Sequence, residues 1–252
     1  MTDKPAVRKP AVGERLALPA LACGAVLTTV ALLLSFFTAP LVLGAKVSVP
    51  ALIGEQMVTN KLLLSQKIFY FHVPVALASF VMMGVAAWFG FRFLTKRDAS
   101  FDLRAKVAIE IALVFILMTM ASGEMWTRYE WGVWWTWDPR LTTYLILMLL
   151  VIAYFVLRAS IDDAERRAVY SSVFAIIAFA DAPISLLITR LVPSSVHPVI
   201  FRTDSGLKPS MLLPFLMSLF GMMLVSYGLY YFRLREQNLK TRLATLKATI
   251  EN

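Results

Sequence analysis

Six apolar stretches divide this chain of 252 residues, and each reaches or approaches the roughly 20 residues that a helix needs to cross a bilayer. Charged residues make up only 16% of the chain, which is less than a soluble domain of this size carries. The sequence therefore predicts an all-α polytopic membrane protein, with residues 1–252 forming a single integral membrane domain. The predicted transmembrane helices cover about 18–43, 68–91, 107–125, 141–158, 168–190 and 210–232.

Lysine and arginine are unevenly shared between the two sets of segments that flank these spans. One set holds 17 of them and the other holds 8. Because basic residues collect in cytoplasmic segments, both chain termini are predicted to be cytoplasmic in a multi-pass plasma-membrane protein. The richer set is the N-terminal tail, 92–106, 158–167 and the tail from 233, and the poorer set is 44–67, 126–140 and 190–209.

A tryptophan-rich segment, residues 126–140, lies between the third and fourth spans and is predicted to face the outer compartment. It holds five of the six tryptophans, whose aromatic rings could form a flat shelf for a large flat ligand. An ordinary aromatic belt at the membrane interface is the alternative. If the segment is helical, three of these rings share one face and form an amphipathic platform in the interface. The five are Trp126, Trp131, Trp134, Trp135 and Trp137.

The chain has only two histidines, His72 and His197, and the predicted topology puts both on the same side as the tryptophans. Neutral imidazole is a common ligand of iron, and two facing imidazoles can bind both axial positions of a haem. The alternative for each is an interfacial histidine bonded to a loop carbonyl. Their shared location favours a ligand site.

Asp138 and Pro139 begin the fourth span, as an N-cap and a first-turn proline do. Arg140 could pair with Asp138 or with an anionic group of a ligand, such as a haem propionate. Weaker candidates for that second role are Lys67, Arg128 and Arg202.

Two carboxylates fall inside the apolar stretches. Asp181 is either a functional intramembrane carboxylate or the cap of a helix that restarts after a break at Pro183. Glu110 lies near a cytoplasmic end and is predicted to pair with a basic residue there. The tail from 233 is predicted to continue the last span as a helix.

Several functions are disfavoured by what the sequence lacks. The single cysteine, Cys23, allows neither a disulfide within the chain nor a multi-cysteine metal site. The sequence has no P-loop, so ATP hydrolysis by that route is excluded. Despite the formal charge of +9, no basic stripe with interleaved aromatic residues indicates a nucleic-acid partner.

The run from Trp131 to Thr142, Trp-Gly-Val-Trp-Trp-Thr-Trp-Asp-Pro-Arg-Leu-Thr, resembles the WWD motif of the haem-handling proteins of cytochrome c maturation. Within that group the chain is most similar to the six-span haem exporter protein C (CcmC-type) family. The stretch from Lys67 to Pro74 resembles that family's first histidine region. The stretch from Asp181 to Ser185, with His197, resembles the region before its last span. The resemblance covers roughly 60–225.

This resemblance implies a function, a ligand and partners. His72 and His197 would ligate non-covalent haem b at the periplasmic face, with the five tryptophans, Asp138 and Arg140 around it. The protein would pass haem to a periplasmic haem chaperone for c-type cytochrome biogenesis. Its partners would be the ATPase and permease subunits of an ABC transporter and a small single-span accessory subunit, within the lipid of the bacterial inner membrane.

Two other functions compete with haem transfer. A cofactor-free membrane subunit of an ABC-type exporter agrees with the plain apolar spans and the missing ATPase motif. A membrane redox enzyme or a synthase that forms thioether bonds would need more histidines than one bis-histidine haem site uses. The sequence therefore predicts a haem-transfer protein and no independent enzyme.

Overall fold

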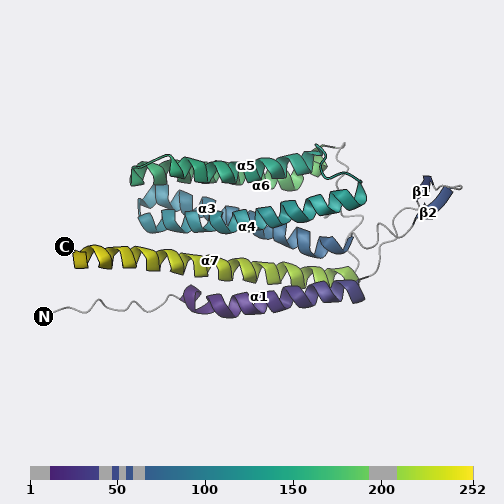
Figure 1. Ribbon diagram of the computed structural model, residues 1–252, viewed down its shortest axis with the longest axis horizontal. Helices are drawn as coiled ribbons and strands as arrows, with labels where there is room; N and C mark the ends of the chain where they lie inside the picture. The colour runs from purple at the N-terminus through teal and green to yellow at the C-terminus, as the bar shows by residue number, and fades with distance from the viewer. Residues whose placement is uncertain (1–11, 40–46, 51–54, 59–65, 193–208, 252) are drawn as a thin grey trace.

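The computed structural model describes residues 12–39, 47–50, 55–58, 66–192 and 209–251 of the chain (Figure 1). Six of its helices are long and apolar enough to cross a membrane, which confirms the predicted fold class. They are α1 (Val12–Phe37), α3 (Phe69–Lys96), α4 (Ala99–Glu130), α5 (Pro139–Ala159), α6 (Ala164–Leu191) and α7 (Pro209–Glu251).

Two short strands were not predicted. β1 (Val47–Pro50) and β2 (Glu55–Val58) form an antiparallel pair in which Val47 lies opposite Val58. Figure 1 places this pair beyond the end of the bundle at which α1 ends and α3 begins. A one-turn 3₁₀ helix, η1 (Gln66–Ile68), leads directly into α3.

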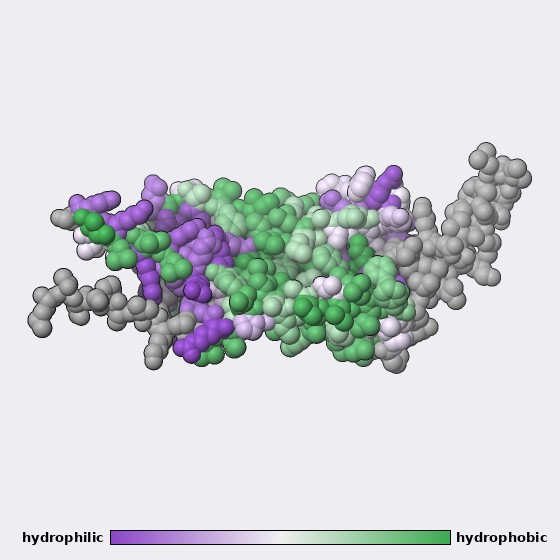
Figure 2. Space-filling model, turned by 60° about the horizontal axis from the view of Figure 1, so that its bottom comes forward, coloured by the Kyte–Doolittle hydropathy of each residue, from purple (hydrophilic) through white to green (hydrophobic). Residues whose placement is uncertain are grey.

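The helices run side by side along the long axis of the molecule (Figure 1). The central pair is α3 and α4, whose buried side chains form the core together with those of α5, α6 and α7. Val75, Met83, Ile109, Phe115 and Leu147 are almost fully buried there. Figure 2 shows the apolar band around the middle of the bundle, as expected for a surface that faces lipid chains.

Helix α1 is attached mainly through α7, and glycines allow the two backbones to approach closely. A Cβ atom added at Gly24 would lie 2.7 Å from the carbonyl oxygen of Gly221, and one added at Gly228 would lie 2.8 Å from Cβ of Leu21. Larger side chains at these positions would force the helices apart.

The start of α1 and the end of α7 lie at one end of the bundle, and we call this the charged end (Figures 1 and 2). Only Arg97 and Asp98 separate α3 from α4 there, so the segment 92–106 is mostly helical, not a loop. Asp98 caps α4 by accepting a hydrogen bond from the backbone N–H of Ser100. That bond holds the pKa of its carboxyl below the ordinary value.

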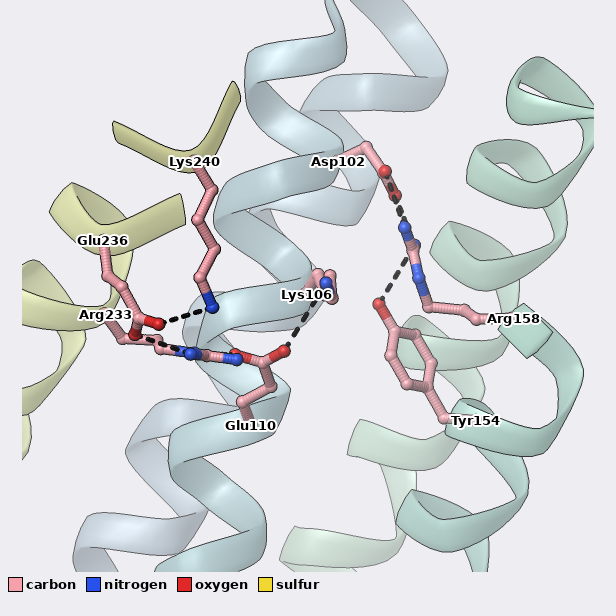
Figure 3. Close-up of polar contacts among 8 residues, drawn as sticks. All are labelled: Asp102, Lys106, Glu110, Tyr154, Arg158, Arg233, Glu236 and Lys240. Carbon is pink, nitrogen blue, oxygen red and sulfur yellow. Dashed lines mark hydrogen bonds and ion pairs between the residues drawn. The ribbon is translucent and has the colours of Figure 1, made fainter. Parts of the chain in front are cut away.

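Ion pairs connect the helices at the charged end (Figure 3). Asp102 of α4 pairs with Arg158 of α5 at 2.6 Å, and Glu110 of α4 pairs with Arg233 of α7 at 2.6 Å. Lys106 lies 3.6 Å from Glu110. The predicted pairing of Glu110 with a basic residue is therefore confirmed. The opposite end of the bundle, which carries residues 126–140, is called here the tryptophan-rich end.

Candidate ligand-binding site at the tryptophan-rich end

His72 lies in the first turn of α3, and its imidazole is half-buried against α4. Nδ1 lies 2.9 Å from Oγ of Ser122, which itself lies 2.8 Å from the carbonyl oxygen of Met118. A serine hydroxyl has a single hydrogen. If it is donated to Met118, the oxygen accepts the Nδ1–H of His72. That arrangement leaves the imidazole lone pair on Nε2, the atom that would bind a metal.

The residue after Ser122 makes room for the imidazole. A Cβ atom added at Gly123 would lie 3.1 Å from Cε1 of His72, which is tighter than ordinary van der Waals contact. The Ser122–Gly123 pair therefore provides both a hydrogen-bond partner and space for the ring.

A proline two residues after His72 connects this turn to α7. Pro74 has no backbone N–H, so the carbonyl of Tyr70 loses its ordinary donor within the helix. Ser218 of α7 replaces that donor, with its hydroxyl 2.5 Å from the Tyr70 oxygen. Because Ser218 is fully buried, α7 holds the helical turn that carries His72 in place.

The tryptophan-rich segment does not form the amphipathic helix that the spacing of its tryptophans allows. Helix α4 ends at Glu130, and 131–138 form an irregular loop. Gly132 has a φ of 74°, in the left-handed region that glycine adopts readily, and it turns the chain. The buried hydroxyl of Thr127 then donates to the carbonyl of Trp134 at 2.9 Å, which fixes the loop against the end of α4.

The tryptophan rings do not form one flat shelf. Trp126 and Trp131 meet edge to face, with ring centroids 5.1 Å apart and planes at 73°. Trp135 and Trp137 form a second such pair at 5.7 Å and 86°. Trp137 is 75% exposed and Trp134 is 61% exposed. These two rings are therefore the most exposed of the five tryptophans in the segment.

Asp138 caps α5, as its position before Pro139 predicts. Its carboxylate accepts a hydrogen bond from the backbone N–H of Arg140 at 2.9 Å and is nearly buried, at 7% exposure. The capping interpretation of Asp138 and Pro139 is thus confirmed. The guanidinium of Arg140 lies 3.5 Å from the carbonyl of Ser185 and 3.4 Å from that of Leu186, both in α6.

Two of the weaker anion-binding candidates have structural partners. The ammonium of Lys67 donates to the carbonyls of Ser35 and Ala39 at the end of α1, the second at 2.8 Å. Burial lowers the pKa of this ammonium. Arg128 donates to the carbonyl of Gly132 and lies over the ring of Trp134. Arg202 and His197 lie outside the described residues.

Asp181 does not cap a helix restart, because α6 continues through Pro183 to Leu191 without a break. That interpretation is wrong. One oxygen, Oδ2, is buried and has no hydrogen-bond partner among the residues that the structure describes. The hypothesis of a functional intramembrane carboxylate stays a prediction.

Sequence reasoning missed Ser122, Gly123 and Ser218. The first two form a pair of small residues one turn before Trp126, and such a pair can indicate close approach of another side chain. Ser218 carries no comparable signal. Within the described ranges, no group of three or more histidine, cysteine, aspartate and glutamate side chains could hold a metal ion.

These features define a helical polytopic membrane protein that carries a histidine and a tryptophan-rich loop at one end. Comparison with known proteins gives the family. The sequence model of the Heme exporter protein C family matches residues 11–249, and the chain belongs to that family.

Individual proteins named Heme exporter protein C are also similar to the chain. The chain is 30% identical to Heme exporter protein C of Bradyrhizobium diazoefficiens over 72% of its own length and 70% of the relative's. It is 29% identical to Heme exporter protein C of Escherichia coli K12, over 68% and 69%. It is 35% identical to the Rhodobacter capsulatus protein of the same name, over 47% and 49%.

Proposed function

We propose that this protein binds non-covalent haem b at the tryptophan-rich end and transfers it to a periplasmic haem chaperone during cytochrome c maturation. Membership of the Heme exporter protein C family supports haem handling as the general role. The observation that carries the proposal is the hydrogen bond between Nδ1 of His72 and Ser122, because it orients an imidazole for iron.

The side chains at this end suit a haem chemically. His72 would donate the Nε2 lone pair to the iron, and His197 is the proposed second axial ligand. Trp134 and Trp137 offer exposed aromatic faces to the porphyrin. The long contacts of Arg140 with two α6 carbonyls are weak, so a propionate could replace them with a charge-assisted bond.

Transfer of haem to the chaperone would require the two proposed histidine ligands to release it. His72 and His197 would hold the haem through its iron, and release of the haem would require both imidazoles to give up that contact. His72 is held by Ser122 and its helical turn by the α7 contact to Tyr70, and we propose His72 as the ligand that is retained until the haem is passed on.

The cellular setting is part of the proposal. The excess of lysine and arginine at the charged end supports a cytoplasmic location for that end, and therefore a periplasmic location for the tryptophan-rich end, in a bacterial inner membrane. An ABC transporter, with its ATPase and permease subunits, and a small single-span subunit are the proposed partners. Bond formation to the cytochrome would occur elsewhere, so the protein itself needs no catalytic group.

Haem content tests this proposal. The full chain and a His72→Ala variant are purified in detergent from cells supplied with haem, and haem per protein is measured as its pyridine complex. Trp88→Phe is the control, because Trp88 is the one tryptophan outside the segment. We expect stoichiometric haem in wild type and control, and a loss of at least tenfold in His72→Ala. A haem-free wild type would instead favour a cofactor-free transporter subunit.

A further inference from the structure

Helix α7 is far longer than a membrane span. Its 43 residues correspond to about 64 Å at 1.5 Å per residue, about twice the thickness of the hydrocarbon core. The helix continues without interruption past Arg233 to Glu251, as the sequence predicted for the tail. In Figure 1 this last part, drawn in yellow, extends beyond the ends of the neighbouring helices.

An apolar stripe runs along that extension. Leu239, Leu243, Leu246 and Ile250 follow one another at spacings of four, three and four residues, which is the a/d pattern of a coiled coil. Their exposures are 48%, 58%, 49% and 83%. A regular stripe of exposed leucine-type residues on a polar helix indicates an interaction surface. We call these four residues the tail stripe.

Basic residues border the tail stripe on both sides. In the heptad defined by the stripe, Lys240 and Lys247 occupy e positions, and Arg235 and Arg242 occupy g positions. Side chains at e and g face the partner helix and determine which partner is accepted. Lys240 also pairs with Glu236 at 2.7 Å, but both side chains are largely exposed, so this pair contributes little and can be exchanged (Figure 3).

This charge pattern opposes pairing with a second copy of the chain. A parallel pair would bring each g arginine against an e lysine, and an antiparallel pair would bring lysine against lysine and arginine against arginine. Like charges in these positions destabilise a coiled coil. The complementary partner is a helix with leucine-type residues at a and d and with glutamate or aspartate at e and g.

The membrane surface fits the tail stripe less well than a protein does. The stripe begins about 9 Å and ends about 26 Å beyond Arg233 along a continuous helix. Arg233 is held to Glu110 of α4 at 2.6 Å, which keeps the extension in line with the bundle. A helix that leaves the bilayer along the bundle axis does not lay its apolar side on the bilayer plane.

We propose that the tail stripe binds an acidic amphipathic helix of a partner protein at the charged end. The contact covers about two heptads. A coiled coil of this length has a low affinity by itself, but the contact becomes effective when both partners belong to one membrane assembly, because their local concentration is then high. The proposal is independent of haem binding, since it concerns the opposite end of the molecule.

Two designed 21-residue helices test the proposal. Both carry leucine at a and d, and one carries glutamate and the other lysine at e and g. Binding to the full chain in phosphatidylcholine nanodiscs is measured by fluorescence anisotropy, with empty discs alongside. We expect at least tenfold tighter binding of the acidic helix. The variant Lys240→Glu/Lys247→Glu should lose this preference, and Leu243→Gln/Leu246→Gln should lose binding. Equal binding of both helices by the wild type would overturn the proposal.

A second measurement separates a protein partner from lipid. An environment-sensitive dye is attached at Thr249→Cys, an exposed g position beside the tail stripe, in a Cys23→Ser background, and its emission is compared in phosphatidylglycerol and phosphatidylcholine discs. We expect the same emission in both lipids and a blue shift only after the acidic helix is added. A blue shift in phosphatidylglycerol alone would identify the anionic membrane surface as the occupant and reject the proposal.

Discussion

At the scale of single residues, the environment of His72 differs from that of an ordinary interfacial histidine. Its Nδ1 contacts a side-chain hydroxyl of the neighbouring helix, and Gly123 leaves space beside the ring. The sequence identified His72 through its place near the tryptophans. It could not identify Ser122, because a serine in an apolar span commonly bonds to its own helix, as this one also does.

The hydroxyl of Ser122 should determine haem affinity through the orientation of His72. We expect Ser122→Ala to weaken haem binding by about 10- to 100-fold, the usual cost of losing a partner behind a metal ligand. Ser122→Thr keeps the hydroxyl and should stay close to wild type. Titration of the purified apo-protein with haem measures both. Unchanged affinity in Ser122→Ala would show that His72 needs no such support.

Space beside the imidazole can be tested separately. Gly123→Ala adds a methyl group 3.1 Å from Cε1 of His72 and should displace the ring, with at least a fivefold loss of haem affinity. Gly84→Ala is a matched control, because its added methyl would meet Cε2 of Phe179 at 3.3 Å, and Phe179 is not among the proposed haem-binding residues. If both variants bind haem equally well, Gly123 has no specific role.

At the scale of elements, apolar length predicts the helices better than it predicts their ends. The charged segments around 92–106 and after Arg233 are helical, because hydrophobicity marks the part of a helix in lipid and not its continuation into water. Residues 131–138, by contrast, are not helical although their sequence allows a helix. A pattern with tryptophans at i, i+3 and i+4 fits a helix, but the left-handed Gly132 and the bond between Thr127 and Trp134 form a loop instead.

The contact between α7 and the first turn of α3 should contribute measurably to stability. Ser218→Ala leaves the carbonyl of Tyr70 without its donor, at a cost of about 1–3 kcal/mol for a buried group. Thermal unfolding in detergent measures this change. Ser226→Ala is the control, since Ser226 is equally buried but donates to Met223 of its own helix. Equal loss in the two variants would mean that the contact between helices adds nothing.

At the scale of the whole molecule, the two ends of the bundle have different chemistry. The charged end contains ion pairs that connect α4 with α5 and α7, and the tryptophan-rich end contains aromatic rings and His72. An even number of spans follows from the sequence, whereas the contacts that join the helices do not, because they connect residues as distant as Tyr70 and Ser218.

The orientation of this molecule in the membrane can be measured directly. In a Cys23→Ser background, Tyr129→Cys reports the tryptophan-rich end and Lys247→Cys reports the charged end. We expect a membrane-impermeant maleimide to label position 129 from the periplasmic side of spheroplasts and position 247 only after lysis. The reverse pattern would place the tryptophan-rich end in the cytoplasm, where a periplasmic chaperone could not reach it, and would contradict the proposed transfer.

The most direct test of axial ligation by His72 is the visible absorption spectrum of the haem-loaded protein, as wild type and as His72→Ala, each with and without added imidazole. We predict a low-spin bis-histidine spectrum in the wild type, its loss in the variant, and its return when imidazole occupies the vacated space. A low-spin spectrum in His72→Ala that matches the wild type without imidazole would contradict the assignment.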